Sequence, residues 1–190
     1  MELTRLIKED MRPALGVTEP GAIAFAVAKA KSYTNGEVKK VKVALNSGMY
    51  KNAFTCGIPN SNEVGNLFAA ALGYVAGNAE KGLESLADVT EADNLAAQEL
   101  IDENKVTVEL SGITSRIYIQ ACVETDSERV VVTIRDSHTN ITKIEVNEEV
   151  IFESEAEHGT DTSEVVGESV VHPIHKYTLA DILECNFTIM

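Results

Sequence analysis

The chain has 190 residues, of which 44% are hydrophobic, and its 30 acidic and 16 basic side chains give a net charge of −14. This length favours one domain with at most a small appendage, and the acidic balance argues against a nucleic-acid groove, which needs clustered lysine and arginine. No apolar run reaches the ~20 residues of a membrane span, and the N-terminus lacks a signal-peptide pattern. We therefore expect a soluble, cytoplasmic protein with neither a nucleic-acid nor a membrane partner.

Helical patterns dominate the first half of the chain. They cover residues 3–12, 19–33, 63–77, 82–86 and 90–103. The patterns at 19–33 and 63–77 are apolar on nearly all sides, which predicts that both helices are buried. Gly65, Gly73 and Gly77 in the second of these indicate that a neighbouring backbone comes close.

One strand and one long loop lie between these two helices. Residues 38–45 alternate as VKKVKVAL, which predicts a half-buried strand. Its lysines, Lys39, Lys40 and Lys42, are typical of a solvated sheet edge. Residues 46–62 are rich in Gly, Asn, Ser and Pro, a composition that favours turns.

The pattern changes to strands from Lys105 onward. Alternating segments occupy residues 106–110, 116–125, 128–136, 141–147 and 149–154. The turns between them are short, which predicts an antiparallel meander. We therefore expect an α+β fold, in which the helices of the first half pack on a mostly antiparallel sheet formed mainly by the second half.

We expect three divisions of the chain. Residues 1–152 form the α+β domain. Residues 153–172 form an acidic linker or arm, since residues 153–170 hold six acids and no base. Residues 173–190 contain a short helix over Thr178–Cys185 and an apolar ending, NFTIM, which suits a partner surface or a homo-oligomer contact.

The first candidate site is the segment RPALGVTEPG, residues 12–21. Thr18 is a candidate N-cap of the helix that follows, and an N-terminus with unpaired N–H groups can hold a carboxylate or a phosphate. Thr18 and Glu19 would add a hydroxyl and a carboxylate beside that anion. The alternative is an ordinary N-cap with proline in the first turn.

Two further segments carry polar side chains in loops. Lys51 and Asn52 could clamp a small carboxylate, or could simply be a solvated pair. Ser137, His138, Thr139 and Asn140 share one turn between strands, and His138 could exchange protons near neutral pH. Turns favour Ser and Asn for their own sake, so a purely structural turn is the alternative.

The cysteines and the remaining histidines give little indication of a metal site. Cys56, Cys122 and Cys185 are odd in number and far apart, which suits a reducing compartment and buried structural thiols. His172 and His175 flank a proline, which disfavours a regular helix that would pair them. We predict no metal ligands in this chain.

Several segments resemble the L-cysteine desulfidase family, whose relatives are the iron–sulfur L-serine dehydratases. RPALGVTEP resembles that family's KPALGCTEP, and SHTNITKIEVNEEVIFE is similar to its GHTNI turn and the next hairpin. MYKNAFTCGIPNSNEVGNLFAAALGYVAGNAEKGLESL looks like its lysine–asparagine loop and the following apolar helix, and TLADILE also resembles a family segment. The likeness covers nearly the whole chain in order, although this chain would match only the family's N-terminal half.

The resemblance implies a lyase of amino-acid metabolism that eliminates sulfide or water from L-cysteine or L-serine to give pyruvate and ammonia. In that family an open iron of a [4Fe-4S] cluster acts as Lewis acid. The cluster cysteines would lie in a C-terminal half that is missing here or supplied by a partner subunit. The substrate-binding residues implied are Thr18, Glu19, Lys51, Asn52, Ser137, His138, Thr139 and Asn140.

One departure from the family pattern bears on activity. Val17 stands where the motif has cysteine, and an aliphatic side chain cannot act as base, nucleophile or ligand. The catalytic residue is therefore unknown, with His138 as the candidate. We expect an N-terminal fragment or split subunit that is inactive alone. The alternative is a diverged, non-catalytic relative that binds an amino acid or another protein.

Overall fold

The computed structural model describes residues 3, 5–6, 13–113, 115–154 and 176–181. The chain divides into two compact units, Ala14–Ala156 and Met1–Pro13 with Glu157–Met190. The predicted helix at 3–12, the acidic segment after residue 154 and most of the C-terminal segment lie outside the described residues. Residues 179–181 are helical, where a helix from Thr178 was predicted.

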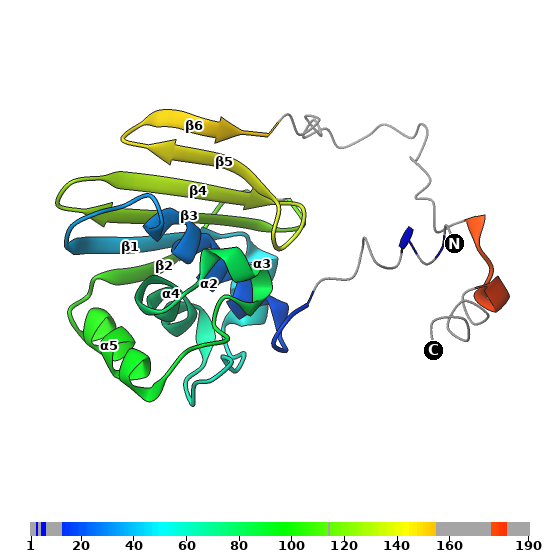
Figure 1. The fold of residues 1–190 in the computed structure, drawn as a ribbon, viewed down its shortest axis with the longest axis horizontal. Coiled ribbons are helices and arrows are strands. Elements are labelled where there is room, and N and C mark those ends of the chain that lie inside the picture. The colour runs from blue at the N-terminus through cyan, green and yellow to red at the C-terminus, as the bar shows by residue number, and fades with distance from the viewer. Residues whose placement is uncertain (1–2, 4, 7–12, 114, 155–175, 182–190) are drawn as a thin grey trace. The chain divides into compact units, whose positions relative to one another are not determined.

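The unit Ala14–Ala156 has the predicted α+β fold, with one six-stranded sheet and a layer of helices (Figure 1). The strands are β1 Val38–Leu45, β2 Val106–Leu110, β3 Tyr118–Thr125, β4 Arg129–Arg135, β5 Ile141–Val146 and β6 Glu149–Glu153. The helices are α2 Thr18–Lys31, α3 Ser47–Ala53, α4 Gly65–Val75, the 3-10 helix η1 Ala79–Glu84 and α5 Glu91–Asp102. α3 lies in a segment predicted to be loop.

Alternate residues of the central strands point into the core beneath α2 and α4. Val41 and Val43 of β1 are buried, whereas the alternating residues Lys40 and Lys42 are exposed. The same alternation places Ala121 of β3 in the core. One face of the sheet is therefore apolar and covered, as the period-two pattern predicts.

The strand order confirms the predicted antiparallel meander for β3, β4, β5 and β6 and corrects it for β2. The sheet runs β2-β1-β3-β4-β5-β6, so β1 lies between β2 and β3, and β1 pairs with β2 in parallel, Val41 opposite Val106. The connection through α3, α4, η1 and α5 supplies the crossover that a parallel pair requires. β1 is consequently not an edge strand, and Lys42 instead pairs with Glu109 of β2 at 2.9 Å.

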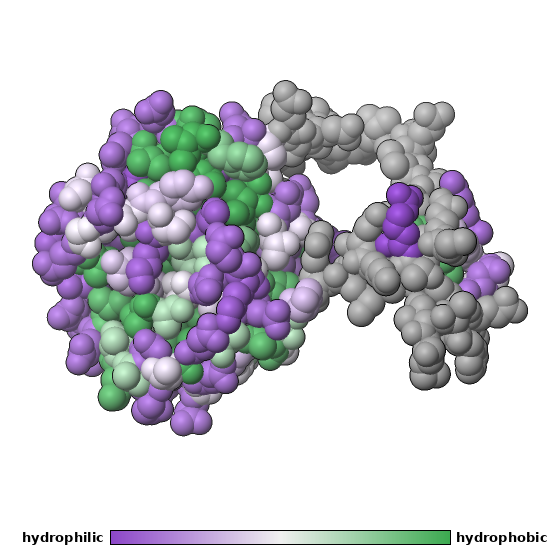
Figure 2. Space-filling model, in the orientation of Figure 1, coloured by the Kyte–Doolittle hydropathy of each residue, from purple (hydrophilic) through white to green (hydrophobic). Residues whose placement is uncertain are grey.

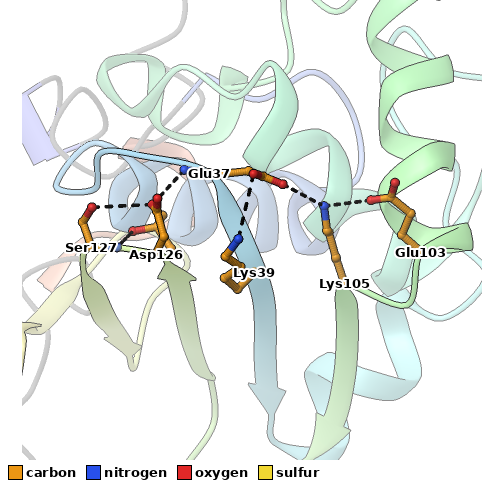
Figure 3. Close-up of polar contacts among 7 residues, drawn as sticks. Glu37, Lys39, Glu103, Lys105, Asp126 and Ser127 are labelled. Atoms are coloured by element: carbon orange, nitrogen blue, oxygen red, sulfur yellow. Dashed lines mark hydrogen bonds and ion pairs between the residues drawn. The ribbon is translucent and has the colours of Figure 1, made fainter.

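A polar network ties three strands together at the end of the sheet where β1 begins (Figure 3). Lys105 Nζ lies 2.8 Å from a Glu103 oxygen and 3.8 Å from a Glu37 oxygen. The Glu37 backbone N–H donates to Asp126 Oδ1 at 3.0 Å. Exposed pairs of this kind contribute ~0–1 kcal/mol each, so the network aligns the strand ends more than it stabilises the fold.

α2 is buried along most of its length because it packs against α4 through small residues. Every residue from Pro20 to Ala28 is buried. A Cβ added to Gly73 of α4 would lie 2.7 Å from both Cα and O of Ala24. The predicted burial of this helix and the close approach at Gly73 are both confirmed.

The β6 edge of the sheet carries exposed apolar side chains. Val150, Ile151 and Phe152 are 43%, 48% and 45% exposed. Hydrophobic surface gathers at this edge in the space-filling view (Figure 2). Among the described residues, no helix is long and apolar enough to cross a membrane.

Gly73→Ala should lower the free energy of unfolding by about 1–3 kcal/mol, because the added methyl group meets backbone atoms of Ala24. At an open helical position the same change stabilises by ~1 kcal/mol. Gly48→Ala in α3 is the control, since the nearest atom to its added Cβ is Asn46 Nδ2 at 3.7 Å. Urea unfolding measures both variants. A Gly73→Ala protein as stable as Gly48→Ala would contradict the close contact.

Candidate functional site

The N-terminus of α2 has no side-chain cap. Its N-cap residue is Val17, in extended conformation and 45% exposed, and Thr18 is the first helical residue. The prediction of Thr18 as N-cap is therefore wrong by one position. Valine has no oxygen to accept the first-turn N–H groups, so the positive end of the helix keeps donors open toward solvent.

Four predicted residues meet at this helix end, and we refer to Thr18, Glu19, Asn52 and His138 as the Thr18 cluster. Thr18 Oγ1 donates to Glu19 Oε2 at 3.2 Å, and Asn52 Nδ2 donates to Glu19 Oε1 at 3.1 Å. His138 Nε2 lies 3.5 Å from Thr18 Oγ1. Residues from α2, from α3 and from the β4–β5 turn are thus joined through one carboxylate and one hydroxyl.

Only one side chain of the predicted turn joins the cluster. Asn140 Nδ2 donates to the Arg135 carbonyl at 3.1 Å and closes the turn itself. Thr139 lies near Gly82 of η1, with Cγ2 3.9 Å from the position of an added Cβ. Ser137 is exposed, and within the described part of the chain only its backbone makes hydrogen bonds, to the Arg135 carbonyl and from the Asn140 N–H. His138 is the functional candidate of the four.

Lys51 and Asn52 differ in what the fold does with them. Asn52 is drawn into the cluster, whereas the exposed Lys51 side chain makes no hydrogen bond or ion pair within the described residues. The turn of α3 also brings Cys56 close, and its half-buried thiol donates to the Asn52 carbonyl at 2.7 Å. Of the lysine–asparagine pair, only Asn52 joins the cluster, and a clamp on a ligand's carboxylate stays a prediction.

The environment of His138 favours a neutral imidazole. Partial burial lowers the pKa of His138, the Glu19 carboxylate raises it, and the Arg116 guanidinium lowers it, with a net shift downward. Since the Thr18 hydroxyl hydrogen points to Glu19, the contact with Thr18 suits an Nε2–H donor and leaves Nδ1 as the unprotonated nitrogen. A neutral ring of this tautomer can accept a proton at Nδ1.

Sequence reasoning missed Arg116. It begins the alternating pattern at 116–125, which predicts a strand and does not indicate a functional residue, and in the structure it lies in the irregular segment before β3. Only the strand pairing that sets Tyr118 opposite Arg135 brings this segment beside the turn that carries His138.

The described cysteines do not fit the iron–sulfur cluster that the resemblance implies. Cys56 follows α3 and Cys122 lies in β3, where burial raises the pKa of its thiol. Among the described residues, no group of three or more His, Cys, Asp or Glu side chains could hold a metal ion. A cluster brought by other segments or by a partner stays a prediction.

Three comparisons place the chain beside known proteins. It matches no protein-family model and no solved structure. It is 37% identical to a UPF0597 protein of Clostridium botulinum (strain Hall) over 153 residues, which are 80% of this chain and 35% of that protein. It is 40% identical over 139 residues to a UPF0597 protein of Caldanaerobacter subterraneus, which are 73% of this chain and 33% of the relative.

A UPF0597 protein of Clostridium perfringens (strain SM101) is 34% identical over 160 residues, 84% of this chain and 38% of the relative. The chain spans about a third of the length of these curated relatives.

These relatives correct the expected family. They are named UPF0597 proteins, and no L-cysteine desulfidase or L-serine dehydratase name appears among them. The assignment of the chain to the L-cysteine desulfidase family, as its N-terminal half, is therefore wrong. The likeness rested on segments that form the start of α2, the stretch from α3 through η1, and the β4–β5 turn with the hairpin of β5 and β6. A resemblance read from such segments describes the architecture that they share and does not by itself establish the family.

Val17→Ser should raise the free energy of unfolding by about 1 kcal/mol, because a serine N-cap can accept a first-turn N–H group that valine leaves uncapped. Thermal and urea unfolding of the variant measure the gain. Val17→Ala is the matched control, since alanine caps no better than valine. Equal stability of the serine and alanine variants would show that the helix end is already capped.

The stability of the protein should fall as the pH drops below about 6.5, the ordinary histidine value. Because the folded pKa of His138 is lowered, the unfolded chain binds the proton first, and stability is lost progressively as the pH falls toward the folded pKa. His138→Gln should remove this part of the loss between pH 7.5 and 5.5. Urea titrations across that range test it, and identical pH profiles for both proteins would contradict the assignment.

Proposed function

We propose that the chain binds a small α-amino acid, L-serine or L-cysteine, at the Thr18 cluster. The convergence of Glu19, Asn52 and His138 on an uncapped helix end carries the proposal. These contacts are between side chains, so they do not serve the backbone hydrogen bonding of α2 or α3. A few convergent polar groups are what fixes the orientation of a small ligand in a binding site.

The charges of the cluster match the two ends of an amino acid. The N–H groups and dipole of the α2 N-terminus suit a carboxylate. The Glu19 carboxylate, already held in place by Thr18 and Asn52, suits an ammonium group. A ligand that bears only one of these charges would leave the other pole of the site without a partner.

The reaction we propose at this site is β-elimination of water from L-serine, or of hydrogen sulfide from L-cysteine. The resulting aminoacrylate tautomerises to an imine, which water hydrolyses to pyruvate and ammonia. His138 would accept the Cα proton at Nδ1, which its neutral state and its place beside Thr18 support. Loss of the β-hydroxyl or β-thiol must be assisted by a group from outside the described residues. The chain would therefore supply binding and proton transfer, in the cytoplasm, and would be inactive without that group.

The second candidate is an amino-acid-binding domain without catalysis. Val17 favours it, because an exposed aliphatic side chain stands at the helix end where a reactive group would be most useful. Both candidates require amino-acid binding, so one experiment tests their common claim. A second experiment then separates the two candidates. The segments of a UPF0597 relative that this chain does not match are added, and pyruvate formation from L-serine is measured.

Glu19→Gln should weaken the binding of L-serine by about tenfold or more, because the amide loses the charge that faces the ammonium. Its one carbonyl oxygen can still accept from Asn52, and its NH2 group can donate to the Thr18 hydroxyl. Isothermal titration calorimetry of L-serine and L-cysteine measures it. Glu99→Gln, at an exposed position of α5, is the matched control and should bind normally. Absence of binding by the unmodified chain at millimolar ligand would reject the proposal.

A further inference from the structure

We propose that Arg116 anchors the carboxylate of the bound amino acid and so makes the site selective for zwitterions over amines that lack a carboxylate. This inference rests on the proposed amino-acid binding and adds a residue that the sequence gives no reason to choose. Three features of the structure carry it, namely the place of the Arg116 backbone, the freedom of its side chain and the balance of charge around the cluster.

The backbone at Arg116 is held by a single buried side chain. Asn46, which is 5% exposed, donates from Nδ2 to the Ser115 carbonyl at 2.7 Å and to the Arg116 carbonyl at 3.3 Å. Its Oδ1 accepts from the backbone N–H groups of Met49 at 3.4 Å and Tyr118 at 3.3 Å. Asn46 therefore fixes the segment before β3 against the first turn of α3, the helix that carries Asn52.

The other side of the same segment contacts the turn that holds His138. The Asp136 N–H donates to the Ile117 carbonyl at 3.1 Å, just before the turn begins. Arg116 is thus placed between α3 and the β4–β5 turn, the two elements that deliver Asn52 and His138 to the cluster. The carbonyls of Ser115 and Arg116 accept from Asn46, and that of Ile117 accepts from the Asp136 N–H, so the position of the Arg116 Cα follows from the fold and not from its side chain.

The Arg116 side chain is available for a ligand. It is exposed, and its guanidinium makes no hydrogen bond or ion pair with the residues that the structure describes. The nearest acid of the cluster, Glu19, is already engaged by Thr18 and Asn52. The positive field of Arg116 nevertheless reaches the imidazole of His138 and opposes its protonation.

An arginine in this place has a chemical advantage over a lysine. Its planar guanidinium presents two parallel N–H donors that match both oxygens of a carboxylate. Arg116 would bind the carboxylate and Glu19 the ammonium group, so the site would recognise both charges of an amino acid. The neutral His138 between them would then face the Cα hydrogen.

Calorimetry with two probes tests the role directly. L-serine carries a carboxylate, and ethanolamine is the same skeleton without it. Arg116→Gln should lower the affinity for L-serine by about tenfold or more and leave the weaker binding of ethanolamine unchanged. Arg116→Lys should lose less, because it keeps the charge. Arg129→Gln is the matched control, since this exposed arginine begins β4, at the opposite end of the strand from His138, and pairs with Glu124.

Titration of His138 by NMR gives a second readout that does not depend on a ligand. Arg116→Gln should raise the pKa of His138, whereas Arg129→Gln should leave it unchanged. Equal affinity for L-serine in Arg116→Gln and the unmodified chain would overturn the inference and leave amino-acid binding intact. An unchanged His138 pKa in Arg116→Gln would also overturn it. Absence of L-serine binding by the unmodified chain would reject both the inference and the proposed function.

Discussion

The close contact between α2 and α4 is the constraint on which the rest of the structure depends. At Gly73 the two backbones approach so closely that a single methyl group would meet Ala24. This contact lets α2 lie in the core between α4 and the sheet, with most of its residues buried. A helix enclosed on all sides along its length can reach solvent only at its ends. The candidate site is at one of them.

The position of that helix end has an energetic consequence. An uncapped first turn costs about 1 kcal/mol relative to a serine or aspartate cap, and the fold carries this cost at Val17. The burial of α2 offsets it several times over, since the buried side chains of Ile23, Phe25 and Val27 contribute about 1.5–3 kcal/mol each. The helix end can therefore stay open to a ligand without endangering the fold.

Much of the fold could be predicted because sequence patterns within each segment determine its secondary structure and its buried face. The buried α2 and α4, the capped α5 and the strands follow from periodicity, glycine and cap residues that lie within each segment. The insertion of β1 beside β2 could not be predicted in this way, because parallel pairing depends on a crossover of about sixty residues whose course no local pattern specifies. α3 was missed because turn-forming residues also suit a short helix that Asn46 caps.

The residues of the candidate site likewise fall into those that local patterns predict and those that only the tertiary structure reveals. Thr18, Glu19, Asn52 and His138 stand in polar segments that the sequence marks out, and the fold brings them together. Asn140 and Thr139 stand in an equally marked segment and serve the turn or its packing instead. No local pattern indicates that Arg116 is functional, and only long-range strand pairing brings it near the site. Sequence patterns thus identified which segments are polar, and the tertiary structure decides which of their side chains face the same point.

The most direct test of the central claim is a titration of isotope-labelled chain with L-serine, followed by the backbone amide resonances. Shifts concentrated at Thr18–Gly21, Asn52 and His138 are the predicted result. The main competing location is the apolar pocket of about 370 Å³ that Tyr50, Phe54 and Leu67 help to line. Shifts confined to that pocket, or no shifts at saturating L-serine, would contradict the account.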